Sequence, residues 1–155
     1  MRVASSRDMP TAAKLVGAVV FGGVGAAAAW LGIPTLPEEV PPGYLLPLSA
    51  GLGVWLGWTL MGRNAGRAGR TVAINYGIAT VIVMVVAAIF SIAFWEMIER
   101  SMRLRYDGPG EAVLDVANLI VFYGKFLFVT PVLMVLALGA VLGGVIVHAV
   151  SRLWR

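Results

Sequence analysis

The chain has 155 residues, of which 59% are hydrophobic and only 13% are charged, and its formal net charge is +4. Soluble domains average about 45–50% apolar and about 25% charged residues, and a chain this short cannot bury such an excess of apolar surface. The composition therefore excludes an ordinary soluble domain and indicates an integral membrane protein. The basic residues flank apolar runs instead of forming one dense patch, which argues against nucleic-acid binding. Because the sequence has no cysteine, it provides no disulfide and no thiol site.

Four apolar stretches are long enough for a membrane helix, which needs about 20 residues to cross a hydrocarbon core about 30 Å thick. We expect spans at about 11–31, 44–61, 71–95 and 126–150 within a single domain, 1–155. The first apolar run is long for a cleavable signal peptide, so we interpret it as a retained span. The expected fold class is an all-α membrane protein with four transmembrane helices.

The connections between these spans are also readable. Residues 33–43 hold four prolines and two glutamates, which predicts a loop because prolines at that density cannot sustain a helix. Residues 62–70 predict a short loop that carries Arg63, Arg67 and Arg70. These arginines are candidates for binding an anion or acidic lipid headgroups, although topology alone also explains a short basic loop.

The interval from residue 96 to 123 is the longest polar segment. Glu96 with Arg100 and Glu99 with Arg103 have the i,i+4 spacing of helical ion pairs, so the third helix should continue past the membrane. After a turn signal at 107–110, residues 111–123 predict a short amphipathic interfacial helix on the outer side. Glu111, Asp115, Asn118 and Lys125 fall near one of its faces. One helix from there to the end of the fourth span would be too long for the bilayer, so we expect a bend near Gly124 or at Thr130-Pro131.

The distribution of basic residues predicts the orientation, because lysine and arginine near span ends favour the cytoplasmic side. With both termini inside, eight basic residues are cytoplasmic: Arg2, Arg7, Lys14, Arg63, Arg67, Arg70, Arg152 and Arg155. Four lie outside: Arg100, Arg103, Arg105 and Lys125. We therefore predict an N-in, C-in protein of the bacterial inner membrane.

Small residues recur at four-residue spacing on two of the expected spans, which is the pattern of close helix packing in membranes. They are Ser49, Gly53 and Gly57 on the second span, and Gly139 with Gly143 and Ala140 with Gly144 on the fourth. The pattern leaves open whether the contact lies within the chain or with a partner. The polar residues of the third span, Asn75, Thr80 and Ser91, are expected to form interhelical hydrogen bonds.

No constellation of residues predicts catalysis. The sequence lacks a nucleophile motif, a phosphate loop and an intramembrane carboxylate pair, and His148 is its single histidine. That histidine has no acidic or thiol neighbour in its span, so an interfacial role is sufficient for it. We expect neither enzyme activity nor a bound metal or cofactor.

Four segments together resemble the TrgA-type membrane proteins, a family associated with tellurite resistance in alphaproteobacteria. They are MPTAAKLV at 9–16, GRNAGR at 62–67, RYDGP at 105–109 and RLWR at 152–155. Because residues 1–8 precede the usual start of that family, Met1 and Met9 both stay open as the native start. The resemblance implies a phenotype and supplies no catalytic residues.

A chain without cysteine cannot be the thiol that reduces tellurite, so a non-enzymatic protein acting through helix packing and partner interaction is the leading hypothesis. The expected docking surface combines Asn118 and Lys125 with the face of Gly139 and Gly143. Membrane lipid and a membrane-protein partner or homo-oligomer are the expected contacts. An accessory subunit of a larger photosynthetic or respiratory complex is the first alternative, and an oligomeric oxyanion transporter is the second.

Overall fold

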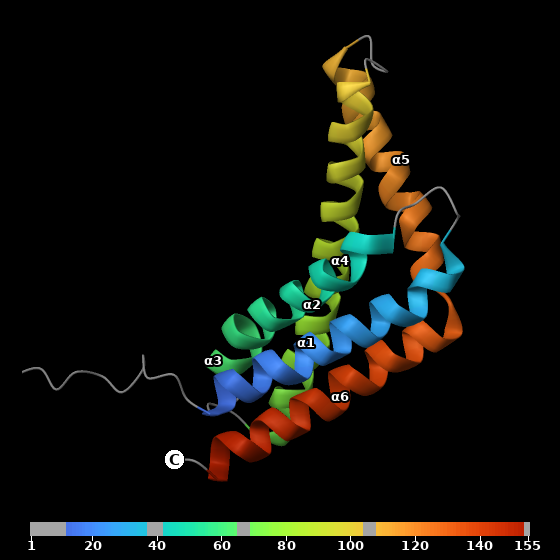
Figure 1. The fold of residues 1–155 in the computed structure, drawn as a ribbon. Coiled ribbons are helices and arrows are strands. Elements are labelled where there is room, and N and C mark those ends of the chain that lie inside the picture. The colour runs from blue at the N-terminus through green and yellow to red at the C-terminus, as the bar shows by residue number, and fades with distance from the viewer. Residues whose placement is uncertain (1–11, 37–41, 65–68, 104–107, 154–155) are drawn as a thin grey trace, which may run out of the picture.

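The computed structural model describes residues 12–36, 42–64, 69–103 and 108–153, and these ranges contain helices and turns but no strand (Figure 1). The α-helices are α1 (Ala12–Gly32), α2 (Leu45–Leu56), α3 (Gly62–Asn64), α4 (Arg70–Met102), α5 (Pro109–Leu127) and α6 (Thr130–Leu153). Two 3-10 turns, η1 (Ile33–Thr35) and η2 (Pro42–Tyr44), follow α1 and precede α2, and a π turn, η3 (Gly57–Met61), joins α2 to α3.

Four helical segments in these ranges are long and apolar enough to cross a membrane: Ala12–Thr35, Leu45–Asn64, Arg70–Met102 and Thr130–Leu153. They correspond to the four predicted spans, so the predicted fold class, an all-α membrane protein, is confirmed. The helix predicted at 111–123 is present as α5, which begins two residues earlier and ends four residues later.

The four spanning segments form a closed ring in which each contacts two neighbours. Helix α1 packs against α2 and α6, and α4 packs against α2 and α6. The core between them is built from Phe21, Leu56, Met84, Val132 and Val147, all buried. The first residues of α1 and the last residues of α6 lie at the same end of the ring (Figure 1). We call this end, which also carries Arg63 and Arg70, the arginine side, and the opposite end the α5 side.

The second span is longer than predicted, because its helix continues through η3 and α3 to Asn64 instead of ending near residue 61. The π turn keeps the backbone bonded, since the amide of Gly62 donates to the carbonyl of Gly57. The Asn64 side chain then donates to the carbonyl of Leu60 over 2.8 Å. Part of the predicted loop 62–70 is therefore helical, and residues 65–68 lie outside the described ranges.

The bend between α5 and α6 falls at Phe128 and Val129, directly before Thr130-Pro131. Pro131 lies in the first helical turn of α6, where its missing amide hydrogen costs nothing. Gly124 stays within α5, so that alternative for the bend is wrong, and the last span starts at Thr130 instead of near residue 126.

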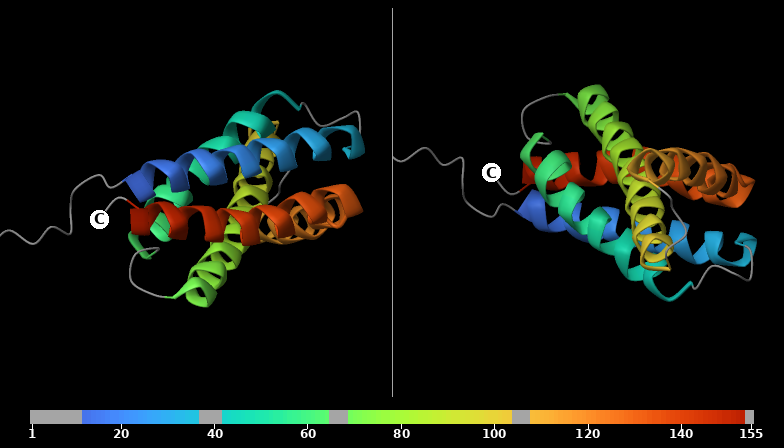
Figure 2. Two further views of the ribbon diagram at one scale, coloured as in Figure 1. Left: turned by 90° about the horizontal axis from the view of Figure 1, so that it is seen from below. Right: turned by 90° about the horizontal axis from the view of Figure 1, so that it is seen from above.

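Helix α4 extends beyond the ring on the α5 side, as its ion-pair spacing predicted. At about 1.5 Å per residue its 33 residues exceed the thickness of a hydrocarbon core. Its outer part runs beside α5, and both cross the direction of α1 and α6 (Figures 1 and 2). The hydroxyls of Thr80 and Ser91 bond the carbonyls of Tyr76 and Ala87 within α4, so the interhelical bonds predicted for them are wrong. The preceding turn of the same helix offers the nearest acceptor.

Candidate functional site

The small residues of α2 and the first residue of η3 lie against α1 and allow its backbone to approach closely. A Cβ atom added at Gly53 would collide with the carbonyl oxygen of Phe21, and one at Gly57 with that of Gly17. One turn further, a Cβ at Gly25 would collide with the carbonyl oxygen of Ser49. Each step of four residues along α1 thus matches a step of four back along α2. The predicted face of Ser49, Gly53 and Gly57 makes its contact within the chain.

The small residues of α6 face two different helices of the same chain. Gly139 meets the side chain of Val24, and Gly143 meets Phe21 and Val20, all on α1. On the neighbouring face, Ala140 meets Gly77 of α4, and a Cβ at Gly144 would lie 2.8 Å from the carbonyl oxygen of Ala73. The expectation that Gly139 and Gly143 form part of a partner-docking surface is therefore wrong, because α1 already occupies that face.

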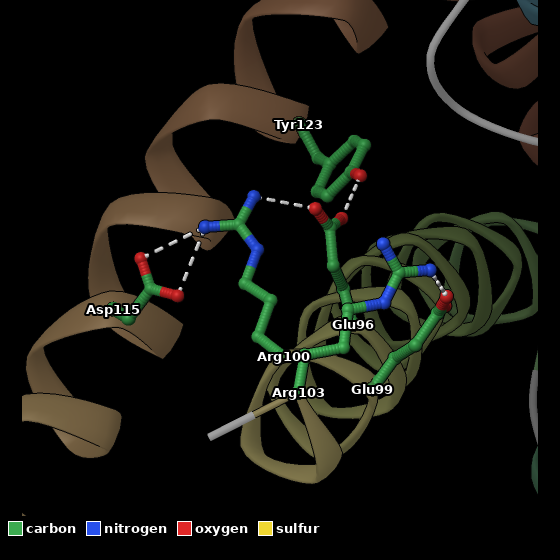
Figure 3. A network of polar contacts seen from close by, with 6 residues as sticks. All are labelled: Glu96, Glu99, Arg100, Arg103, Asp115 and Tyr123. Atoms are coloured by element: carbon green, nitrogen blue, oxygen red, sulfur yellow. Dashed lines mark hydrogen bonds and ion pairs between the residues drawn. The ribbon is translucent and has the colours of Figure 1, made fainter. Parts of the chain in front are cut away.

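Four side chains form a polar network where α4 and α5 run side by side (Figure 3). Glu96 accepts a bond of 2.5 Å from Nη2 of Arg100, one helical turn further on. Nη1 of Arg100 donates to both carboxylate oxygens of Asp115 on α5, at 3.2 and 3.0 Å. The hydroxyl of Tyr123, also on α5, donates to the second oxygen of Glu96. Two residues of α4 are thereby bonded to two residues of α5.

The network lies over a small apolar cluster that joins three elements. Ile92 and Ala93 of α4 pack with Leu119 and Tyr123 of α5 and with Leu45 at the start of α2. Burial, followed by the hydrogen bond to Glu96, raises the pKa of Tyr123 above its usual value of 10.0. Tyr44, which ends η2, also has a raised pKa, caused first by burial and then by the charges of Glu96 and Glu99. The inward side of α5 is therefore fixed by both apolar and polar contacts.

The second predicted ion pair, between Glu99 and Arg103, is more exposed than the network around Arg100. Nη2 of Arg103, the residue that follows α4, donates to Glu99 over 2.7 Å, as the spacing predicted. Both side chains are well exposed, and such pairs contribute little to stability. This pair does not attach α5 to α4.

The outward side of α5 carries a line of exposed residues at spacings of three, four, four and three: Glu111, Leu114, Asn118, Phe122 and Lys125. We call this line the α5 face. Leu114 is 67% exposed and Phe122 is 42% exposed. Asn118 and Lys125, the two predicted docking residues, both belong to it, whereas Asp115 turns toward Arg100.

The predicted anion or headgroup residues lie at the other end of the molecule. Arg63 and Arg70 are exposed on the arginine side, and Arg67 falls outside the described residues. Gly62 of α3 packs closely on the backbone of Lys14, and the starts of α1 and α4 lie at the same end of the molecule as α3 (Figure 1).

Sequence reasoning missed two components of this arrangement. The glycines of α1, Gly17 and Gly25, lie on the same face as Phe21 at four-residue spacing, which is the signal applied to α2 but not to α1. The bonds from α5 to α4 had no comparable signal, because Asp115 and Tyr123 are 15 and 27 residues from their partners.

Fold and site together define the class of this protein: a multi-pass, all-α membrane protein whose ring of four spans carries a bonded pair of helices, α4 and α5, on one side. Comparison with protein-family models, with curated proteins and with solved structures gives no significant match.

Proposed function

We propose that this protein is a non-enzymatic, TrgA-type protein of the bacterial inner membrane that acts by docking a protein partner on the α5 face. The observation that carries the proposal is the two-sided character of α5. Its inward side is bonded to α4 through Asp115 and Tyr123, while Leu114 and Phe122 remain exposed on its outward side.

Helix α5 is not among the four spanning segments, so its exposed apolar residues are not accounted for by a transmembrane position. Exposed apolar residues flanked by polar ones are typical of interaction surfaces. A helix held rigidly by its own chain also binds with a smaller entropic cost than a mobile segment. These features support a docking role for α5.

In this proposal, α5 lies at the outer membrane interface and both termini are cytoplasmic. The large exposed fractions of Trp30 and Trp95, 68% and 61%, support this placement because tryptophan favours the membrane boundary. Trp30 lies two residues before the end of α1 on the α5 side, and Trp95 directly precedes the Glu96 of the polar network. The cluster of basic residues on the arginine side supports a cytoplasmic position for that end.

A link to tellurite would then be indirect, through the partner. The chain has no cysteine with which to reduce the oxyanion. A cavity of about 70 Å³ within the ring is lined mainly by apolar groups such as Ala28, Met84 and Leu136. A dianion in such surroundings would lose its hydration without gaining a cationic partner. Docking is therefore better supported than oxyanion transport.

Site-specific photo-crosslinking in native membranes tests the proposal. A benzophenone amino acid at Leu114 should give a discrete protein adduct, identified by mass spectrometry. The same group at Val19, which is 73% exposed on α1, serves as the matched control and should react with lipid. Lipid adducts alone at both positions would contradict docking. Tellurite reduction or transport by the purified protein in liposomes would also require the proposal to be abandoned.

A further inference from the structure

The α5 face has an internal symmetry about Asn118. Leu114 and Phe122 lie four residues before and after it, and Glu111 and Lys125 lie seven residues before and after it. Read in either direction, the line runs charged, apolar, amide, apolar, charged, and all five residues are exposed. On reversal the terminal charges change sign, and Leu114 and Phe122 exchange places.

The α5 face is therefore complementary to a second α5 face that runs in the opposite direction. When two identical helices pack antiparallel about a two-fold axis at Asn118, residues at equal distances before and after it meet. Leu114 then meets Phe122 of the second copy, and Glu111 meets Lys125. The two Asn118 amides meet on the axis, where each has both donors and acceptors to offer the other.

The membrane adds a condition on the direction of α5. Two copies inserted with the same topology are related by a two-fold axis along the membrane normal. An axis in that direction makes two helices antiparallel only when they lie along the membrane plane. Helix α5 crosses the direction of α1 and α6 (Figures 1 and 2), so it lies along the membrane plane when those two spans follow the membrane normal.

We infer that the partner on the α5 face is a second copy of this chain, bound antiparallel about Asn118. The inference rests on the proposed docking function and names its partner. Charge complementarity commits the face to this occupant, because the opposite charges stand at equal distances from the centre. The carboxylate of Glu111 can accept several hydrogen bonds, so bonds within its own chain do not prevent a bond to Lys125 of the second copy.

Disulfide crosslinking tests the axis directly, since the chain contains no cysteine of its own. In native membranes treated with a mild oxidant, Asn118→Cys should form a disulfide-linked dimer in at least fivefold higher yield than Val113→Cys. Val113 is a matched control because it is 69% exposed on the same helix but points roughly 140° away from Asn118. Equal yields from the two variants would overturn the inference.

Charge reversal tests the antiparallel pairing. Glu111→Lys and Lys125→Glu should each weaken dimerisation about tenfold, because each replaces two attractive pairs with two repulsive ones. The double variant should return to within about threefold of the parent, since the reversed charges again meet opposite charges. Copies that carry a donor or an acceptor fluorophore at the C-terminus are mixed and diluted with increasing amounts of lipid. The loss of energy transfer on dilution gives the dimer affinity of each variant.

The outcomes separate this inference from the function on which it rests. Failure of the double variant to recover would overturn antiparallel self-association. If the Leu114 photo-adduct then contains a different protein, the docking function stands and only the second copy is wrong. If that adduct contains lipid alone, both are wrong.

Discussion

Glu96 is the residue at which α4 and α5 are joined most directly. Its two carboxylate oxygens accept from donors on different helices, Arg100 of α4 and Tyr123 of α5. Arg100 in turn bonds Asp115 of α5. The i,i+4 pair of Glu96 and Arg100 within α4 is therefore also connected to α5. The three charged side chains of this network, Glu96, Arg100 and Asp115, are 21–31% exposed, which limits how strongly water weakens the interactions.

Replacement of Tyr123 tests the contribution of its hydrogen bond through pH. Because the folded protein raises the pKa of Tyr123 above 10.0, it holds the phenolic proton more tightly than the unfolded chain does. The resulting stability is fully present below pH 10 and is lost as the pH rises above it. Tyr123→Phe should lower the thermal midpoint at neutral pH, at a cost of about 1–3 kcal/mol.

The same variant should lose less stability than the parent at alkaline pH, so the two melting curves should converge. Circular dichroism melts in detergent, recorded from about pH 7 to about pH 11, measure the thermal midpoints of parent and variant on both sides of the ordinary tyrosine pKa. A constant difference between parent and variant across that range would contradict a role for the phenolic proton.

At the scale of helices, α1 and α2 are held together by backbone approach more than by side-chain interlocking. Gly17, Gly25, Gly53 and Gly57 leave no space for a side chain between the two backbones. In a membrane the hydrophobic effect does not drive helices together, so such close van der Waals contact has to do so. The same helix, α1, also packs against Gly139 and Gly143 of α6.

A pair of alanine substitutions in α2 tests this contact. Gly53→Ala should destabilise the protein by about 1–3 kcal/mol, because its methyl group would force α1 and α2 apart. Gly51→Ala is the matched control, since a Cβ there has open space within 4 Å. It should be neutral or stabilising by up to about 1 kcal/mol, as alanine favours the helix. Equal unfolding in a detergent-titration assay would contradict close packing at Gly53.

At the scale of the whole molecule, the ring gives the protein two ends of different character. The arginine side gathers Lys14, Arg63 and Arg70, and the α5 side carries the network and the α5 face. The four spanning segments of the described ranges bring the end of α6 back to the side on which α1 begins (Figure 1).

Single-cysteine labelling tests which end faces the cytoplasm. A membrane-impermeant maleimide that reaches only the periplasm should modify Ser101→Cys, near the end of α4 on the α5 side, and leave Arg63→Cys unmodified in intact cells. Both positions are exposed, so differences in burial do not explain the result. Permeabilised cells, in which both variants should react, provide the control. Modification of Arg63→Cys alone would reverse the proposed orientation.

The sequence by itself determined the features that depend on neighbouring residues. Apolar runs predicted the four spans, the spacing from Glu96 to Arg100 predicted the extension of α4, and Thr130-Pro131 was one of the two positions predicted for the bend before α6. Each is local because a helix forms from contacts three or four residues apart.

Only the tertiary structure decided which surfaces meet. Helical spacing predicts that Gly139 and Gly143 lie on one face, but it does not predict which helix packs against that face. In the structure this helix is α1. Helical spacing likewise does not reveal that Asp115 reaches Arg100, or Tyr123 reaches Glu96, across 15 and 27 residues. Periodicity defines the direction in which a side chain points along its own helix. The neighbour it finds there depends on how all the helices pack together, and in this protein that packing leaves the α5 face exposed.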